Sequence, residues 1–365
     1  MSSTRGHLWR ITTFGESHGP ALGVIIDGCP PGLTLDLEAI QADLDRRRPG
    51  QSKLTTPRKE PDRAEILSGV FEGVTMGTPI AMLIRTQDAD SRKYIPLKDL
   101  FRPGHADFTY HAKYGRRDWR GGGRSSARET AARVAAAAVA RQWLSARFGV
   151  EVVAWVDRVG EVTSSVDPAS VTREAVEAHP VRCPDPEAAE AMADRIKEIR
   201  KARDTIGGTV SAVARGVPAG WGAPIFDRLE ADLGKACLSL PACKGFEVGS
   251  GFAGTYMLGS AHNDPFVPGD EGQVQTTSNH AGGVLGGIST GMPITLKCAF
   301  KPVATHFQPQ KTVNVEGEAV DFAATGRHDP CVLPRAVPLV EAAMLLTLAD
   351  HALRQLALEG GRLEG

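Results

Sequence analysis

Paired cysteines are missing from this 365-residue chain. Its six cysteines are scattered, and no Cys-x-x-Cys pair or Cys/His cluster occurs. Zinc sites and disulfide frameworks both need such spacing, so the sequence indicates neither. Unpaired thiols are typical of a reducing compartment, which makes the cytoplasm the expected location.

Long apolar segments are also scarce. The longest stretch near the middle, residues 134–140, is mostly alanine and is flanked by Arg133 and Arg141. A membrane span needs about 20 apolar residues. The opening residues, MSSTRGHLWRITTF, lack the apolar stretch of a secretory signal. We therefore expect no membrane partner.

The chain has no excess of charge. Its formal net charge is −1, and aromatic residues make up only 6% of it. A nucleic-acid-binding domain is usually basic and carries aromatic side chains among its basic residues, so a nucleic-acid partner is not expected. Any recognition of an anion must come from local clusters.

The strand patterns come in pairs, and the helices are few and long. Helices are predicted from about residue 36 to the Pro49-Gly50 stop, and over 126–148, 185–204 and 339–358. Strands are predicted over 10–14, 21–28, 65–74, 79–86, 150–162, 209–217, 254–262 and 293–301. This pattern favours one α+β domain over residues 1–365, with helices packed against antiparallel sheets.

The segment GGGRSSARETAARVA combines flexible backbone with positive charge. Gly121, Gly122 and Gly123 can turn backbone N–H groups toward a ligand, and Ser126 opens an S-x-x-E capping box that predicts a helix start. The helix terminus and the arginines beside it, among them Arg124, favour an anion. A solvated loop before an ordinary capped helix explains this stretch equally well.

Three further basic loops strengthen the case for an anion site. DRRRPGQSK and the residues after it hold seven basic side chains between 45 and 63, although Arg46 and Arg47 would also stabilise a helix C-terminus. FRPGHAD contains His105, and GRHDPC contains Asp329. Four such loops in a nearly neutral protein suggest one concave site for a multiply charged anion.

Histidines and an aspartate in these loops could transfer protons. His18 lies in the glycine-bounded turn FGESHGP, between two predicted strands. A lone histidine is more often structural. Together, however, His18, His105 and Asp329 form a plausible acid–base set.

GSGFAG, residues 249–254, matches the dinucleotide fingerprint G-x-G-x-x-G letter for letter. That fingerprint requires a helix to follow. The next residues, TYMLGSAH, are rich in strand formers, so we reject the match. No phosphate-binding loop of the type G-x-x-x-x-G-K-[ST] occurs.

Six motifs, taken together and in order, resemble the chorismate synthases. They are GESHG, DRRRPG, FRPGHAD, GGGRSSARETAARVA, SNHAGGVLGGISTG and GRHDPC, and the similarity runs from about residue 7 to residue 356. The resemblance implies a β-α-β sandwich, with helices between antiparallel sheets, that assembles as a homotetramer.

The resemblance also implies the reaction. A carbon–oxygen lyase of this family removes phosphate and a C6 hydrogen from 5-enolpyruvylshikimate 3-phosphate by anti-1,4-elimination, giving chorismate. Reduced FMN is required without net redox change. The step is the last common one of the shikimate pathway to the aromatic amino acids. The two carboxylates and the phosphate of this substrate would account for the arginines.

Site residues follow by position in the matching motifs. The resemblance makes His18 the proton donor near the leaving phosphate, places His105 at the N1/O2 edge of the reduced flavin, and gives Asp329 a part in deprotonation at flavin N5. The implied substrate-binding residues are Arg47, Arg48, Lys53, Arg102, Arg128 and Arg327. The implied cofactor-binding residues are Arg124, Ser125, Ser126, Pro241, Ala242, Gly286, Lys301, Pro302, Val303, Ala304, Thr305 and Arg327. No metal ligand is implied.

Two positions depart from the family pattern. Pro241-Ala242 stands where many relatives have Asn-Ala, and Lys53 stands where arginine is common. NADPH is expected only as an indirect source of electrons, delivered through an external flavin reductase or another source of reduced flavin. A flavin reductase of another kind and a phosphate- or RNA-binding protein remain the alternatives.

Overall fold

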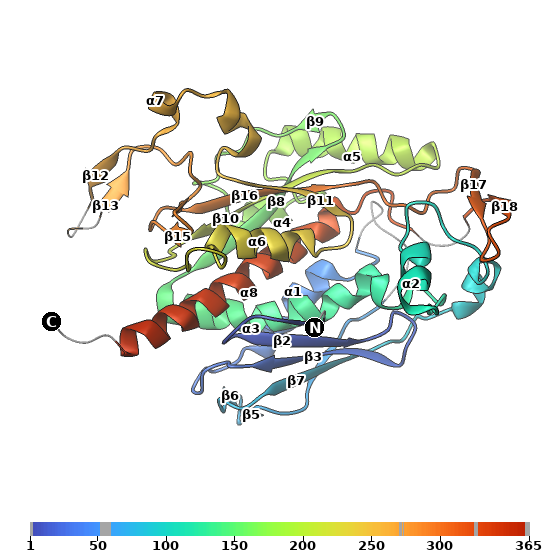
Figure 1. The fold of residues 1–365 in the computed structure, drawn as a ribbon, viewed down its shortest axis with the longest axis horizontal. Helices are drawn as coiled ribbons and strands as arrows, with labels where there is room; N and C mark the ends of the chain where they lie inside the picture. Colours follow the sequence, from blue (N-terminus) through green and yellow to red (C-terminus); the bar gives the residue numbers. More distant parts are fainter. Residues whose placement is uncertain (1–2, 52–59, 270–271, 273, 325–327, 362–365) are drawn as a thin grey trace.

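The computed structural model describes residues 3–51, 60–269, 272, 274–324 and 328–361. Two five-stranded antiparallel sheets enclose a layer of helices, as Figure 1 shows. The predicted β-α-β sandwich is therefore confirmed.

The first sheet has the strand order β1-β2-β3-β7-β4. Its strands are β1 (Thr4–Arg5), β2 (Arg10–Gly15), β3 (Ala21–Asp27), β7 (Ile80–Arg85) and β4 (Ala64–Ile66). In β3 and β7 apolar side chains alternate toward the helices, with Leu22, Val24 and Ile26 fully buried. This alternation is the period-2 pattern of a sheet with one face on the core.

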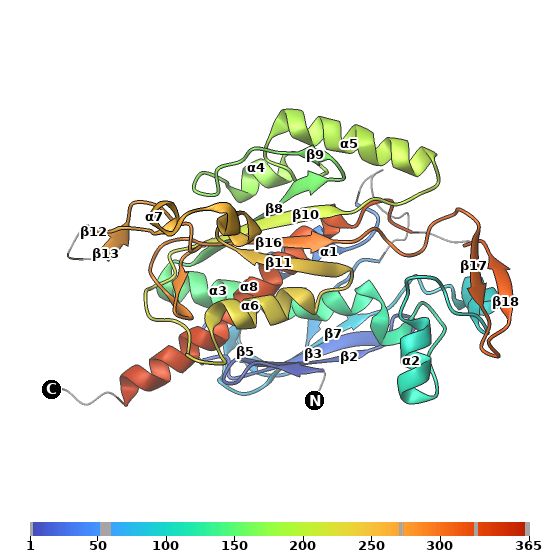
Figure 2. The same ribbon diagram turned by 45° about the horizontal axis from the view of Figure 1, so that its top comes forward.

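The second sheet has the order β11-β16-β10-β8-β9. Its strands are β11 (Cys243–Val248), β16 (Ile294–Phe300), β10 (Gly208–Arg215), β8 (Glu151–Val159) and β9 (Val162–Thr163). Strand β8 is buried along most of its length, since α8 packs against it and the short helix α4 (Arg173–Glu177) and α5 (Pro186–Lys201) also contact it. Figure 2 shows α5 beyond β8 and β9, at the edge of this sheet.

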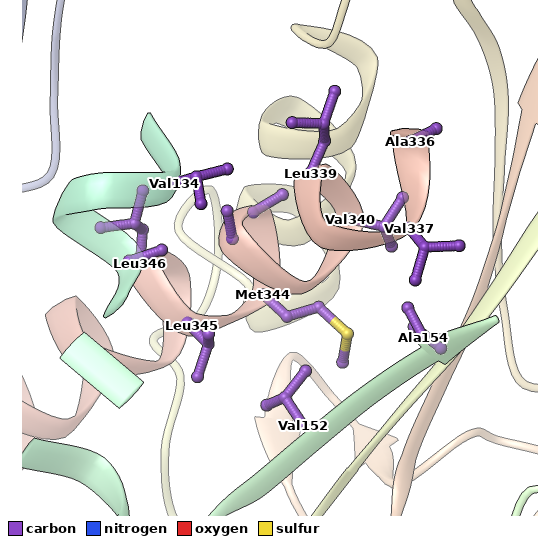
Figure 3. Close-up of a cluster of buried hydrophobic side chains, with 14 of the residues drawn as sticks. Val134, Val152, Ala154, Ala336, Val337, Leu339, Val340, Met344, Leu345 and Leu346 are labelled. Carbon is purple, nitrogen blue, oxygen red and sulfur yellow. The ribbon is translucent and has the colours of Figure 1, made fainter. Parts of the chain in front are cut away.

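Four helices fill the space between the sheets: α1 (Leu37–Arg47), α3 (Thr130–Phe148), α6 (Leu229–Leu238) and α8 (Leu333–Gly360). Buried alanines on α3 allow α8 to approach closely. Figure 3 shows Met344 of α8 directed toward Val152 and Ala154 of β8, within one apolar cluster that includes residues of both sheets.

Helix α8 begins at Leu333, six residues before the predicted start, and ends at the predicted glycines. It is long and apolar enough to cross a membrane, contrary to the expectation that no segment could, but 94% of its most apolar window is buried inside the protein. A helix enclosed on all sides is expected to be apolar on all sides.

Several sequence predictions were wrong in detail. Residues 65–74 are not one strand, because Gly69 and Gly73 adopt positive φ and leave β4 followed by the hairpin β5 (Val70–Phe71) and β6 (Val74–Thr75). Residues 254–262 are not a strand either. They belong to the 3-10 helix Gly251–Tyr256 and to α7 (Gly259–His262).

Other elements had not been predicted. Helix α2 (Asp107–Tyr114) and the 3-10 helix Ser91–Leu97 lie in the polar segment before the triglycine, and α6 and β11 also went unseen. Three hairpins were missed as well: β12 (Phe266–Pro268) with β13 (Val274–Thr276), β14 (Val284–Leu285) with β15 (Ile288–Ser289), and β17 (Gln310–Val313) with β18 (Ala319–Phe322).

Candidate active site

The triglycine loop passes between two histidines. A Cβ on Gly121 would lie 2.3 Å from the His18 ring, and a Cβ on Gly122 would lie 3.3 Å from the His105 ring. Both glycines have positive φ, at +64° and +85°, a conformation that L side chains rarely adopt. Glycine is therefore needed here both for space and for backbone conformation, and the loop brings the GESHG and FRPGHAD motifs together.

His18 is fixed within this arrangement. Its Nδ1 lies 2.9 Å from the hydroxyl of Ser91, and the ring meets Tyr94 edge-on at 5.1 Å. Arg124 holds the strand that leads into the His18 turn, donating to the carbonyl of Gly15 at 3.0 Å and to the hydroxyl of Thr13 at 2.7 Å. Arg124 thus braces the His18 turn with hydrogen bonds to the protein itself.

His105 belongs to a buried charged cluster. Its Nδ1 lies 3.0 Å from Asp107, which also makes a two-point contact with Arg102 at 2.7 and 2.9 Å and accepts from Arg117 at 3.3 Å. Burial lowers the pKa of His105 below its ordinary value. Burial alone would raise the pKa of Asp107, but hydrogen bonds from Arg102 and His105 outweigh it and hold that pKa far below its usual range.

The Nδ1 of His105 has two neighbours, the Asp107 carboxylate at 3.0 Å and Nη2 of Arg102 at 3.1 Å. Because this Arg102 nitrogen donates to Asp107 at 2.9 Å, and because an ionised carboxylate only accepts hydrogen bonds, we assign the proton of the neutral ring to Nδ1, donating to Asp107. The ring's Nε2 then presents a lone pair toward the triglycine loop. This nitrogen can accept a proton, or a hydrogen bond, from a ligand placed beside Gly122.

Arg47 and Arg128 converge on one carboxylate, that of Asp62. Arg47 contacts it at 2.6 Å and also donates to Thr130 and to the carbonyl of Ala127, while Arg128 makes a second ion pair with it. Burial lowers the pKa of Arg47 to about 10, although Asp62 opposes the shift. Direct substrate contact had been predicted for both arginines, yet their side chains are only 2% and 3% exposed.

Arg128 retains unused donors. Its Nε and Nη2 are buried without a hydrogen-bond partner, although Nη2 lies 3.5 Å from a Glu60 oxygen. Two predicted substrate ligands, Lys53 and Arg327, lie outside the described part of the chain, within residues 52–59 and 325–327. Arg48 is half exposed beside Asp45, at 3.6 Å.

Asp329 lies just before α8 and contacts Arg335 of that helix at 2.5 Å. Arg335 also donates to the carbonyl of Arg47 at 3.2 Å. The GRHDPC and DRRRPG motifs therefore meet through one side chain, and Asp329 has a structural partner besides any role in chemistry.

The KPVAT segment packs on the FRPGHAD loop. Lys301 donates from Nζ to the carbonyl of Gly104 at 3.2 Å and from its backbone N–H to Ala242 at 3.0 Å. Ala242 has φ of +66°, which is unusual for a residue other than glycine. Ala242 and the start of the KPVAT segment thus lie together, and that segment reaches Gly104, the residue before His105.

Gly286 is not brought into this group. It forms the tip of the β14–β15 hairpin, and the space around it is open. In Figure 1 this hairpin lies at the opposite end of the molecule from α2, which begins two residues after His105. A single chain therefore does not bring Gly286 near the other predicted flavin-binding residues, and its flavin contact stays a prediction.

An open cavity of about 970 Å³ borders these loops. Arg124, Ser125 and Pro241 line it, but His18, His105 and Asp329 do not. Its other charged lining side chains are mostly basic: Arg5, His7, Lys113, Arg116, Arg117, Arg133 and Lys235, against Glu16, Asp107, Asp118 and Glu129. Such a lining suits an anion.

Sequence reasoning missed the residues that brace the site. Asp107 could have been found, since it follows His105 by two positions in the same motif. Asp62 carries no such signal, because its partners Arg47 and Arg128 are 15 and 66 residues away in sequence. Arg335 lies six residues after Asp329 but outside the GRHDPC motif. Among the described residues, no three His, Cys, Asp or Glu side chains are placed to hold a metal ion.

Known proteins of one family resemble this chain along nearly its whole length. The family model described as chorismate synthase matches residues 9–353. The curated chorismate synthase of Synechococcus sp. (strain WH7803) is 59% identical over 97% of this chain and 98% of its own, and that of Opitutus terrae is 58% identical over 98% of both. A solved structure titled "Crystal Structure of Chorismate Synthase" aligns with a TM-score of 0.74 and 31% identity, over 96% of this chain and 93% of that one. The chain therefore belongs to the chorismate synthase family, a family of lyases in aromatic biosynthesis.

Proposed function

We propose that this protein converts 5-enolpyruvylshikimate 3-phosphate to chorismate by anti-1,4-elimination of phosphate, with reduced FMN as its cofactor and without net redox change. Beyond family membership, the observation that carries the proposal is the triglycine loop between His18 and His105. Its glycines let both rings pack against the loop backbone, so two groups able to exchange protons flank one loop, and the same loop borders the open cavity.

The residues fit a flavin mononucleotide. The cavity beside the triglycine loop, about 970 Å³ in volume, has a largely basic lining that suits the phosphate of this cofactor. Ser125 and Lys301 supply further polar groups beside it. Bound there, reduced FMN supplies electron density that helps expel phosphate from the substrate.

The chain's own residues position the ligands and transfer protons to and from them. The His18 ring can protonate the leaving phosphate from its Nε2, because its Nδ1 is engaged with Ser91. His105 can take up a proton at Nε2 and so balance negative charge on a ligand beside Gly122. We assign Asp329 the role of proton acceptor, and Arg47 and Arg128 the role of holding the substrate anions, for which Arg128 retains unused donors.

The test is anaerobic turnover of the phosphate ester with chemically reduced FMN, followed by the absorbance of chorismate. We expect equimolar phosphate and chorismate, with no lasting oxidation of the flavin. Failure to form chorismate under these conditions would refute the proposal. A flavin reductase would instead consume NADPH without the ester, and an RNA-binding protein would bind oligonucleotides with a steep salt dependence.

The remaining assignments are also proposals. We infer that the chain acts as one catalytic domain in the cytoplasm, assembles as a homotetramer, and receives reduced flavin from an external reductase supplied by NADPH. A tetramer would also give Gly286 a way to approach a flavin, since a hairpin tip far from its own site can reach a neighbouring subunit. Light scattering would test the assembly.

A further inference from the structure

Arg335 joins two of the predicted site residues and is itself assigned no role. It lies in the first turn of α8, and its side chain is 11% exposed. One end of its guanidinium contacts the Asp329 carboxylate at 2.5 Å, and Nε donates to the backbone carbonyl of Arg47 at 3.2 Å. The C-terminal end of α1 and the loop before α8 are therefore tied together at this point.

The backbone just after Asp329 is fixed independently. Ile206 donates its N–H to the carbonyl of Pro330 at 2.9 Å and forms a parallel bridge with Cys331, which is fully buried. Arg335 contacts the Asp329 side chain directly and can set the direction of the carboxylate.

We propose that Arg335 is a positioning residue for Asp329. The planar guanidinium holds the carboxylate at a fixed angle, and through the Arg47 carbonyl it keeps this carboxylate in register with the end of α1. The inference rests on the proposed function, because it concerns the base of that reaction. A misaligned reacting group can cost about 10²-fold in rate.

A double-mutant cycle tests this. We expect Arg335→Met to lower kcat about 10²-fold, and Arg335→Lys, which keeps one charged donor, to lose less. Asp329→Asn should lower kcat by about 10² to 10⁴ while FMN and the ester still bind. If Arg335 acts through Asp329, the double variant should be no slower than Asp329→Asn alone, whereas independent effects would multiply.

Arg215→Met is the matched control. Arg215 is also mostly buried and pairs with Glu151 at 2.7 Å, with further bonds to the carbonyls of Pro168 and Val171, far from the site residues in sequence. We expect both Arg215→Met and Arg335→Met to lower the melting temperature, but Arg215→Met should leave kcat unchanged. FMN binding, followed by flavin fluorescence, gives a readout separate from turnover and should change little in either variant.

The outcomes are distinguishable. An inactive wild-type protein would refute the proposed function, and the inference with it. An active wild type with multiplying effects in the cycle would overturn the role of Arg335 and leave the function standing. Two other results would overturn the role of Arg335 while leaving the function standing. One is an Arg335→Met variant that melts earlier but keeps a normal kcat, and the other is normal turnover in Asp329→Asn.

Discussion

At the scale of single residues, the main charged side chains of this site are buried and paired within the protein. Arg47, Arg102 and Arg128 had been predicted as ligands from their positions in basic motifs, yet each already contacts a carboxylate of the protein. Sequence reasoning saw the positive charge but not its partners. Only the fold brings Asp62 to Arg47 and Arg128, whereas Asp107 lies in the same motif as Arg102 and was overlooked. Asp62 and Glu60 together balance the charge of Arg47 and Arg128, so what remains for an anion is the pair of unpartnered donors on Arg128, Nε and Nη2.

This burial changes what removing Arg47 should do. Arg47→Ala leaves Asp62 buried with one partner fewer, and losing one member of a buried pair costs about 3–5 kcal/mol. We expect a lower free energy of unfolding in addition to weaker ester binding. Chemical denaturation beside a binding titration measures both, and weaker binding at unchanged stability would show that Arg47 faces the ligand instead.

His105 should change its protonation when the site fills. Burial lowers the pKa of His105 in the ligand-free protein, so the ring is neutral at neutral pH. A negative charge beside Nε2 favours the protonated ring, and we expect reduced FMN to raise this pKa. Histidine NMR with and without the anaerobic ligand measures the shift, with His105→Gln to identify the resonance. A further decrease on binding would contradict the assigned role.

At the scale of elements, prediction succeeded where a local pattern was sufficient. Ser126 does cap the helix region at its predicted start, although the first turn is 3-10 and α3 begins at Thr130. Strands β3 and β16 follow from their apolar alternation. Helix α6 and strand β11 were missed because their short apolar patterns resemble each other and only packing on α8 and β16 decides between them.

The GSGFAG segment is a related case. The fingerprint was rejected because strand formers follow it, but those residues form 3-10 and α-helical turns. A strand, β11, precedes the segment, and it pairs antiparallel with β16. The rejection therefore remains sound for a different reason, since a dinucleotide fingerprint belongs to a parallel βαβ unit.

The triglycine loop offers a prediction at the same scale. Gly121→Ala places a Cβ 2.3 Å from the His18 ring at positive φ, so the loop or the histidine must move. Gly149→Ala is matched, since Gly149 also has positive φ, +72°, but a Cβ there meets nothing within 4 Å. Both should lose about 1 kcal/mol from backbone strain. Only Gly121→Ala should also impair FMN binding and turnover. Equal activity in the two variants would show that the triglycine loop is not part of the active site.

At the scale of the whole molecule, the layers are joined by buried charge as well as by apolar packing. Glu341 of α8 is 1% exposed and contacts Arg46 of α1 at 2.6 Å and Arg141 of α3 at 2.7 Å. It also accepts from the backbone of β8 at Ala154, 3.2 Å away. One carboxylate thus links three central helices to the second sheet. No periodicity predicts such a contact, because its members are far apart in sequence.

This carboxylate should make the fold sensitive to acid. Burial would raise its pKa, but Arg46 and Arg141 outweigh burial and lower the pKa of Glu341 to about 2, from an ordinary 4.5. A carboxyl group whose pKa is lower in the folded state contributes stability that is fully present above pH 4.5 and is lost as the pH falls toward 2. A shift of this size corresponds to about 3 kcal/mol.

Glu341→Gln should remove that contribution. The amide is nearly isosteric but removes one of the two carboxylates that Arg46 and Arg141 share, the other being Asp43, so we expect the free energy of unfolding at neutral pH to fall by about 3 kcal/mol, the contribution that the pKa shift represents. The loss of stability below pH 4.5 should also become shallower, because the titrating group is gone. The matched control is Glu198→Gln, whose carboxylate is 68% exposed in its pair with Arg195 and should matter little. Urea unfolding across this pH range measures both effects, and parallel pH profiles for wild type and Glu341→Gln would show that other carboxylates govern acid unfolding.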